Sequence, residues 1–282
     1  MKLLAIDSNS ILNRAFYGVH PLTNKEGQPT HAVYGFLTIL LKMLQEVEPD
    51  FVAAAFDVSR KTFRNELFSD YKGTRKGMPD ELRSQLPLVK EILADLGYKI
   101  VECEGFEADD ILGTLAKACA DTQNQCVVAT GDRDSLQLVD EYVTVRLAST
   151  KAGRPETVLY DTAAVLEKYG VTPPQLIDVK ALMGDTSDNI PGVAGIGEKT
   201  ALSLIAQYHT LDGVYENLKE ENFTKSVYAK LSAGKDAAYL SRILSEIKRD
   251  IPISTELSSY SVGKADKGAA ANLFARLELF SL

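Results

Sequence analysis

The sequence is poor in the side chains that form crosslinks or bind soft metals. Among 282 residues there are three cysteines and three histidines. Cys103, Cys119 and Cys126 show no CxxC spacing, which favours buried thiols over disulfides or a zinc site. No apolar run approaches the roughly 18 residues of a membrane span, and the first ten residues contain Asp7, which argues against a signal peptide. Any metal chemistry must therefore rest on carboxylates.

Negative charge is in excess. The chain has 39 acidic and 31 basic side chains, a net charge of −8. Spread evenly, that charge would argue against nucleic acid as a partner. If nine acids gather around bound cations, however, 30 acids remain against 31 basic groups, and the body of the protein is close to neutral. Binding to DNA is then compatible with the composition.

Short apolar runs alternate with helical patterns over the first 160 residues. Strands are predicted at Lys2–Asp7, Phe51–Asp57, Tyr98–Cys103, Cys126–Asp132 and Val143–Ala148. Residues 31–47 and 108–120 have helical spacing between them. This alternation predicts an α/β fold with a mostly parallel sheet and helices on both faces. After residue 160 the pattern becomes helical, so we expect a core over 1–165 and a helical subdomain over 166–282.

Carboxylates recur where the predicted strands end. Because the carboxyl ends of parallel strands share one edge, we expect these side chains to meet there. The set is Asp7, Asp57, Glu107, Asp109, Asp110, Asp132, Asp134, Asp185 and Asp188. Each one alone could cap a helix or form an Asx-turn. Together they would repel one another unless cations were bound.

Oxygen ligands in a histidine-poor site select hard ions, so we expect at least two Mg²⁺, for which Mn²⁺ can substitute. Two such ions can activate water and stabilise the leaving oxygen of a phosphodiester. A phosphatase of the haloacid dehalogenase type is excluded, because it needs an aspartate two residues after Asp7 and Asn9 stands there.

One internal segment is strongly basic. Residues 60–87 contain Arg60, Lys61, Arg64, Lys72, Arg75, Lys76 and Arg83, interleaved with Phe63, Phe68 and Tyr71. Such a mixture suits a surface that contacts phosphates and stacks on bases. The alternative is a solvated loop whose charge has no function.

Several linked motifs resemble one family along essentially the whole chain. "LLAIDSNSILNRAF", "FDVSRKTFR", "YKGTRKGMP", "GFEADDILGTLA", "GDRDSLQLV" and "GDTSDNIPGVAGIGEKTA" are similar to the 5′ nuclease domain of bacterial DNA polymerase I, in the flap endonuclease superfamily. The resemblance implies a PIN-like (resolvase-like) core, a helical arch insertion at 60–90 and a helix-hairpin-helix DNA-binding element at 190–208. It also implies a 5′→3′ exonuclease and flap endonuclease that removes RNA primers and flaps during DNA replication and repair.

The resemblance assigns roles residue by residue. Asp7, Asp57 and Asp109 match ligands of a first metal ion, with Glu107 and Asp110 supporting it through water. Asp132, Asp134, Asp185 and Asp188 match the second metal's set. Lys72 and Arg75 match a catalytic basic pair that steers and polarises the scissile phosphate. DNA contacts are expected from Arg64, Tyr71, Lys76, Gly192, Gly195, Gly197, Lys199 and Thr200, and a K⁺ site from the carbonyls of Val193 and Ile196.

Two alternative functions remain open: a PIN-type ribonuclease, and a DNA-binding module without catalysis. The basic segment and the helix-hairpin-helix disfavour the first, and the complete acid set disfavours the second. The expected partner is DNA with 5′ flaps, nicks or RNA primers. We further expect a cytoplasmic, nucleoid-associated bacterial monomer, without membrane contact, that is fused to or cooperates with a DNA polymerase.

Overall fold

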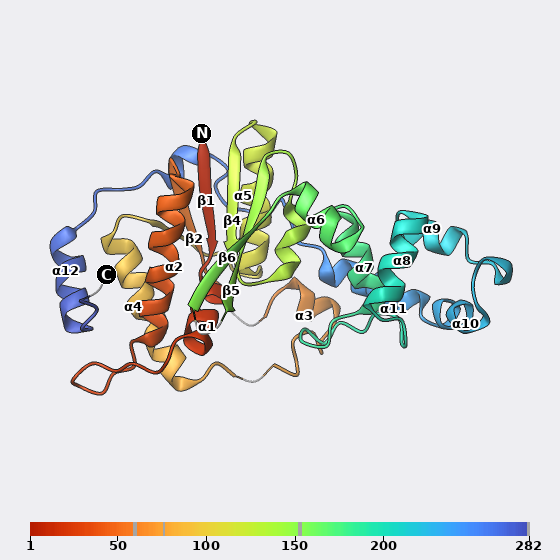
Figure 1. The fold of residues 1–282 in the computed structure, drawn as a ribbon, viewed down its shortest axis with the longest axis horizontal. Coiled ribbons are helices and arrows are strands. Elements are labelled where there is room, and N and C mark those ends of the chain that lie inside the picture. The colour runs from red at the N-terminus through yellow and green to blue at the C-terminus, as the bar shows by residue number, and fades with distance from the viewer. Residues whose placement is uncertain (59–60, 76, 152–153, 281–282) are drawn as a thin grey trace.

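A six-stranded sheet forms the centre of the first part of the molecule (Figure 1). The computed structural model describes residues 1–58, 61–75, 77–151 and 154–280. In spatial order the strands are β3 (Lys99–Val101), β2 (Phe51–Ala55), β1 (Lys2–Asp7), β4 (Gln125–Thr130), β5 (Val143–Lys151) and β6 (Arg154–Tyr160). The first five are parallel, and β6 pairs antiparallel with β5. The mostly parallel sheet is thus confirmed.

Strand β6 was not expected from the sequence. Its residues include Pro155 and Glu156, which are rare inside strands, so the run lacks a strand signature. It forms because it extends the sheet at an edge, beside β5. The five expected strands are all present, with ends shifted by three residues or fewer.

Helices cover both faces of the sheet. On one face lie α1 (Ser8–Gly18), α2 (His31–Val47), α4 (Asp80–Asp95) and α12 (Lys267–Arg276). The other face packs against α5 (Ala108–Asp121) and α6 (Thr162–Tyr169). In α2 the residues Val33, Phe36, Leu37 and Leu40 are almost completely buried, as their helical spacing predicts.

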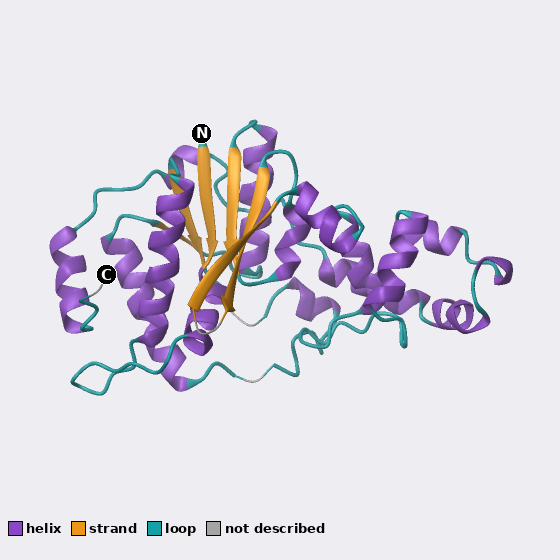
Figure 2. Cartoon of the chain, in the orientation of Figure 1, coloured by secondary structure: helices purple, strands orange, loops and turns teal. Residues whose placement is uncertain are grey.

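The second part of the molecule is helical, and it extends sideways from the sheet (Figures 1 and 2). It contains α7 (Gln175–Met183), α8 (Glu198–Tyr208), α9 (Leu211–Glu216), α10 (Lys225–Ala233) and α11 (Lys235–Ser245). These helices bury a hydrophobic cluster of their own, which includes Leu182, Ile205 and Leu231. Between the two parts lies the short helix α3 (Phe63–Leu67), in the expected arch segment.

After α11 the chain returns to the sheet. Ile251 and Tyr260 are buried in the core on the α5 side, and Leu273 and Leu277 are buried in the core on the α2 side. Ser261 forms a bridge with Phe51 of β2. Residues 246–280 thus include a segment that packs with the sheet, and the expected division into 1–165 and 166–282 stays a prediction.

Candidate functional site

The centre of the site lies at the carboxyl ends of the neighbouring strands β1 and β4. Strand β1 pairs with β2 on one side and with β4 on the other, so a crevice opens beyond their carboxyl ends. Asp7 ends β1 at this crevice and is 5% exposed. Its Oδ1 accepts a hydrogen bond of 2.9 Å from the Ser10 N–H, and its Oδ2 accepts one of 2.9 Å from Thr130 Oγ1 at the end of β4. The place of β1 in the sheet and these two hydrogen bonds together determine the position of the Asp7 carboxylate.

Asp7 is one of the residues that line a cleft of about 1640 Å³. Its acidic lining comes from different elements and consists of Asp7, Asp57, Glu81, Glu107, Asp109 and Asp132. Asp57 accepts a 2.7 Å hydrogen bond from the Ala108 N–H, at the start of α5. Asp109 accepts one of 3.2 Å from Ser135 Oγ. The structure thus brings five of the nine expected acids to one cavity.

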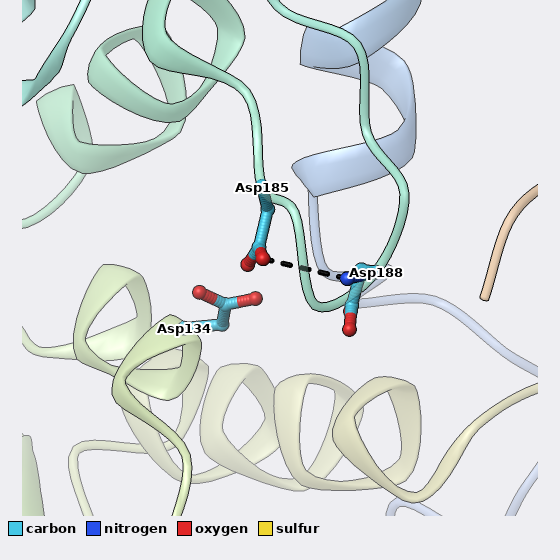
Figure 3. A group of neighbouring side chains, drawn as sticks. All are labelled: Asp134, Asp185 and Asp188. Carbon is cyan, nitrogen blue, oxygen red and sulfur yellow. Dashed lines mark hydrogen bonds between the residues drawn. The ribbon is translucent and has the colours of Figure 1, made fainter. Parts of the chain in front are cut away.

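Three further acids form a separate group beside the cleft. Carboxylate oxygens of Asp134, Asp185 and Asp188 lie within 4.8 Å of one another (Figure 3). Asp134 follows β4, whereas the other two lie on the loop after α7. The Lys180 ammonium contacts Asp134 and is 2.7 Å from Asp185 Oδ2. A lysine therefore supplies positive charge between two of these carboxylates.

Several carboxyls of the site resist ionisation, whereas the pKa of Asp185, in spite of its burial, is lowered to about 2 by the Lys180 ammonium. Burial raises the pKa of Asp7 to about 7, with a further contribution from the charges of Asp57 and Asp132. Burial and the charge of Asp7 likewise raise the pKa of Asp109 well above its usual range. The pKa of Asp134 is raised to about 6, mainly by burial, although Lys180 opposes the rise. Clustered carboxylates that resist ionisation are stabilised when a cation neutralises them.

The raised pKa of Asp7 predicts that the metal-free protein loses stability as pH rises. Its folded pKa lies above the unfolded value, so it contributes stability below about pH 4 that disappears as pH approaches 7. Without divalent ions we expect the free energy of unfolding to fall by on the order of 3 kcal/mol between pH 4.5 and 8. Urea unfolding in EDTA measures this.

Asp7→Asn should remove the part of that pH dependence that Asp7 causes, leave the part that Asp109 and Asp134 cause, and stabilise the protein at pH 8, since asparagine is also a good N-cap. The matched control is Asp161→Asn at the exposed N-cap of α6, which should leave the pH profile unchanged. A pH profile in Asp7→Asn that equals the wild-type profile would show that Asp7 does not contribute to the loss of stability.

Two basic side chains reach into the acidic cleft from the loop after α3. Lys72 Nζ lies 2.7 Å from Glu107 Oε1 and 4.0 Å from Asp188 Oδ2, and the Arg75 guanidinium forms an ion pair with Asp188. Both residues line the cleft, and Arg75 is about half exposed. They therefore bridge the two acidic groups and remain close to solvent.

Other expected site residues lie elsewhere. The Arg64 guanidinium is buried and binds both carboxylate oxygens of Asp110 at 2.8 Å. It also donates to the carbonyls of Leu244 and Glu246. Arg64 thus holds the arch segment to α5 and α11 and presents no surface to DNA. Asp110, which has no exposed surface, faces this arginine instead of the cleft.

Tyr71 also differs from expectation. Only 4% of it is exposed, and its hydroxyl donates to Glu107 Oε2 at 3.1 Å, so its ring is not free to stack on a base. Lys76, the remaining basic residue expected to contact DNA in this segment, lies outside the described residues.

The glycine-rich turn before α8 is only partly available for binding. Gly195, Gly197 and Lys199 are exposed and Thr200 is half-buried. Gly192 is buried, with a positive φ of 58°, and its N–H donates to Ser241 Oγ. A Cβ there would lie 2.3 Å from the Gly184 nitrogen, so this glycine permits backbone packing instead of the expected DNA contact.

The expected K⁺ ligands lie in the same turn. The Val193 carbonyl accepts a 3.0 Å hydrogen bond from the Ile196 N–H. Next to it, Lys230 Nζ donates to the Gly195 carbonyl at 3.1 Å. The Lys230 ammonium therefore already binds a carbonyl of this turn. Binding of K⁺ by Val193 and Ile196 stays a prediction.

Sequence reasoning missed two residues of the site. Lys180 lies in the mostly apolar run of α7, five residues before Asp185, and is buried. A lysine among apolar residues of a helix is unusual, and this could have indicated a charged partner nearby. Arg14, whose guanidinium donates to the Gly131 carbonyl at 2.7 Å, lines the cleft beside Asp132. No sequence pattern indicated it.

Comparison with known proteins supplies a family assignment for both parts. The model for "5'-3' exonuclease, N-terminal resolvase-like domain" matches residues 2–170, and that for "5'-3' exonuclease, C-terminal SAM fold" matches residues 171–268. DNA polymerase I of Caldicellulosiruptor bescii is 44% identical over 282 residues, which are the whole of this chain and 33% of that protein. The chain thus spans about one third of the length of this curated relative.

Solved structures of bacteriophage T5 proteins share the fold. A T5 5′-exonuclease with bound zinc matches with a TM-score of 0.71 at 20% identity, covering 100% of both chains. The T5 D15 flap endonuclease, in a complex with DNA and metal ions, matches with a TM-score of 0.70 at 19% identity, covering 99% of this chain and 100% of that one. Among the described residues, no helix is long and apolar enough to span a membrane.

Proposed function

The chain belongs to the 5′-3′ exonuclease family, and we propose that it is a structure-specific 5′ nuclease that hydrolyses phosphodiester bonds in DNA carrying 5′ flaps, nicks or RNA primers. The observation that supports this most strongly is that Lys72 and Arg75 both line the cleft and pair with acids, Lys72 with Glu107 in the cleft and Arg75 with Asp188 beside it. Basic groups beside a dense carboxylate cluster suit a substrate that is itself an anion. In a module that merely bound DNA, so many carboxylates beside the phosphates would only weaken the binding.

Divalent ions fit the two acidic groups. We propose that Mg²⁺ is held by Asp7, Asp57, Asp109 and Asp132 in the cleft and by Asp134, Asp185 and Asp188 beside it, with Glu107 in support. When bound, such ions lower the pKa of a water molecule and neutralise charge on the phosphate. Asp110 is not included, because Arg64 occupies both of its oxygens.

Lys72 and Arg75 act on the phosphate directly in this proposal. Both cations are held in place by Glu107 and Asp188 before DNA arrives, so little reorganisation is needed when a phosphate enters. The charge on the phosphate oxygens grows in the transition state, and a preorganised cation therefore stabilises that state more than the bound substrate.

The helical part provides a second contact with the duplex. The exposed N-terminus of α8, with Gly195, Gly197, Lys199 and Thr200, offers backbone N–H groups and a positive charge to a phosphate without reading sequence. We propose that K⁺ binds nearby on the carbonyls of Val193 and Ile196. The similarity to DNA polymerase I supports a bacterial cytoplasmic, nucleoid-associated role in replication and repair, in a protein that is joined to a polymerase or works beside one.

One assay tests the proposed function against its alternatives. A labelled 5′-flap DNA, a blunt duplex and a structured RNA are incubated with the protein in Mg²⁺ and, in parallel, in EDTA. We expect cleavage near the flap junction that requires Mg²⁺. Cleavage of the RNA alone would identify a ribonuclease, and tight flap binding without any cleavage would identify a non-catalytic module.

Lys72→Ala should lower kcat for flap cleavage by about 100-fold and change binding much less, because the lost interaction strengthens in the transition state. Single-turnover cleavage and fluorescence anisotropy of the flap DNA separate the two effects. Lys42→Ala, which removes an exposed ion pair on α2, is the matched control and should cleave normally. An effect confined to binding would reduce Lys72 to a steering residue.

A further inference from the structure

Two loops that are distant in the sequence interlock between the basic pair and the acidic group. The Asn189 side-chain amide donates a 2.8 Å hydrogen bond to the Asp70 carbonyl, 119 positions away in the chain. The Lys72 backbone N–H donates to the Asp188 carbonyl, also at 2.8 Å. We call these contacts between residues 70–75 and residues 187–189 the loop clasp.

The backbone on both sides of the loop clasp is in a conformation that few residues adopt. Lys72 has a φ of 55° and Asn189 a φ of 56°. Asparagine tolerates this left-handed region better than most residues, whereas lysine is not favoured there. Each turn therefore needs outside contacts to hold it, and the clasp provides one for each.

Packing beneath the loop clasp is apolar and continuous. Tyr71 and Ile190, the chain neighbours of Lys72 and Asn189, are buried together with Leu244 of α11. Asp185 and Ile190 close the acidic loop with two backbone hydrogen bonds of 2.8 and 2.9 Å. Both loops are thus anchored at their bases, and the clasp fixes their position relative to each other.

The consequence concerns the cleft. Lys72 and Arg75 lie on one side of the loop clasp, and Asp185 and Asp188 lie on the other. A shift of one loop would move the cations away from the carboxylates by the same amount. We propose that Asn189 is a positioning residue that sets the distance between the basic pair and the Asp134, Asp185 and Asp188 group, an inference that rests on the proposed nuclease function.

Asn189→Gly tests this, because glycine keeps the left-handed conformation and removes only the amide. We expect the single-turnover rate of flap cleavage to fall about 10- to 100-fold, the cost of a small misplacement of catalytic groups. Flap affinity should stay within about twofold, since the amide is engaged with the Asp70 carbonyl. In the same variant, exchange of the Lys72 backbone amide should accelerate about tenfold, because its local opening becomes easier.

The matched control is Asn217→Ala, which removes a 2.9 Å side-chain to backbone hydrogen bond in the helical part. It should change neither the cleavage rate nor the Lys72 exchange, and a normal urea midpoint shows that each variant is folded. Unchanged exchange in Asn189→Gly would overturn the loop clasp. Faster exchange with an unchanged cleavage rate would overturn the positioning role.

The proposed function and the loop clasp can fail separately. If the wild-type protein does not cut the flap, the nuclease proposal and the positioning role are both wrong. Amide exchange in Asn189→Gly still decides whether the contact exists.

Discussion

Asp109→Asn should abolish Mg²⁺-dependent flap cleavage, by about 1000-fold or more, and leave flap binding almost unchanged. Asp109 lies in the cleft, and within the part of the chain that the structure describes its carboxylate accepts one side-chain hydrogen bond, from Ser135, which leaves it able to bind a cation. Its high pKa shows that the folded protein disfavours the charge unless a cation compensates it. An amide of the same shape removes that charge without leaving a void. Single-turnover cleavage and anisotropy measure the two quantities.

The same helix provides the control for Asp109. Asp121, at the far end of α5, forms an exposed ion pair with Lys117. Asp121→Asn should cut the flap at the wild-type rate. If Asp109→Asn also cut at that rate, the proposed metal site would be wrong.

Arg64→Met should destabilise the fold by about 3–5 kcal/mol, because it leaves the Asp110 carboxylate buried without its partner. The loss should be much larger than for Arg83→Met, which removes an exposed ion pair with Asp80 and should cost less than about 1 kcal/mol. Urea unfolding measures both variants.

A double variant separates the buried charge from lost packing. Arg64→Met combined with Asp110→Asn should recover a large part of the lost stability, since no buried charge then remains unpaired. If the losses of unfolding free energy in the two single variants simply add up in the double variant, Arg64 acts through packing alone.

The acids of the cleft were largely predictable. Asp7, Asp57 and Asp132 could be placed at one edge because parallel strands end on the same side of a sheet, and each strand was recognisable as a buried apolar run. The structure places all three in the same cleft.

The fate of Arg64 could not be foreseen, because it depends on contacts between distant parts of the chain. Its Nε bonds to a carbonyl 180 residues away, at the end of α11. In the sequence it is one of several basic residues in a segment with DNA-binding character. Gly192 is similar: a glycine that binds phosphate and one that permits packing look alike until Gly184 lies beside it. In both cases the role of the residue depends on tertiary contacts, which the periodicity of apolar residues in the sequence does not predict.

The return of the chain after Ser245 has a kinematic consequence. The helical part is joined to the sheet at two places, before α7 and after α11, and the second connection is anchored by Ile251 and Tyr260. Arg64, which bonds to the Leu244 carbonyl, and the loop clasp hold the helical part in addition to these two connections, so its movement relative to the sheet is restricted. If α8 contacts the duplex as we propose, the distance between that contact and the cleft would be nearly constant. This distance would then determine which phosphodiester bond is cut.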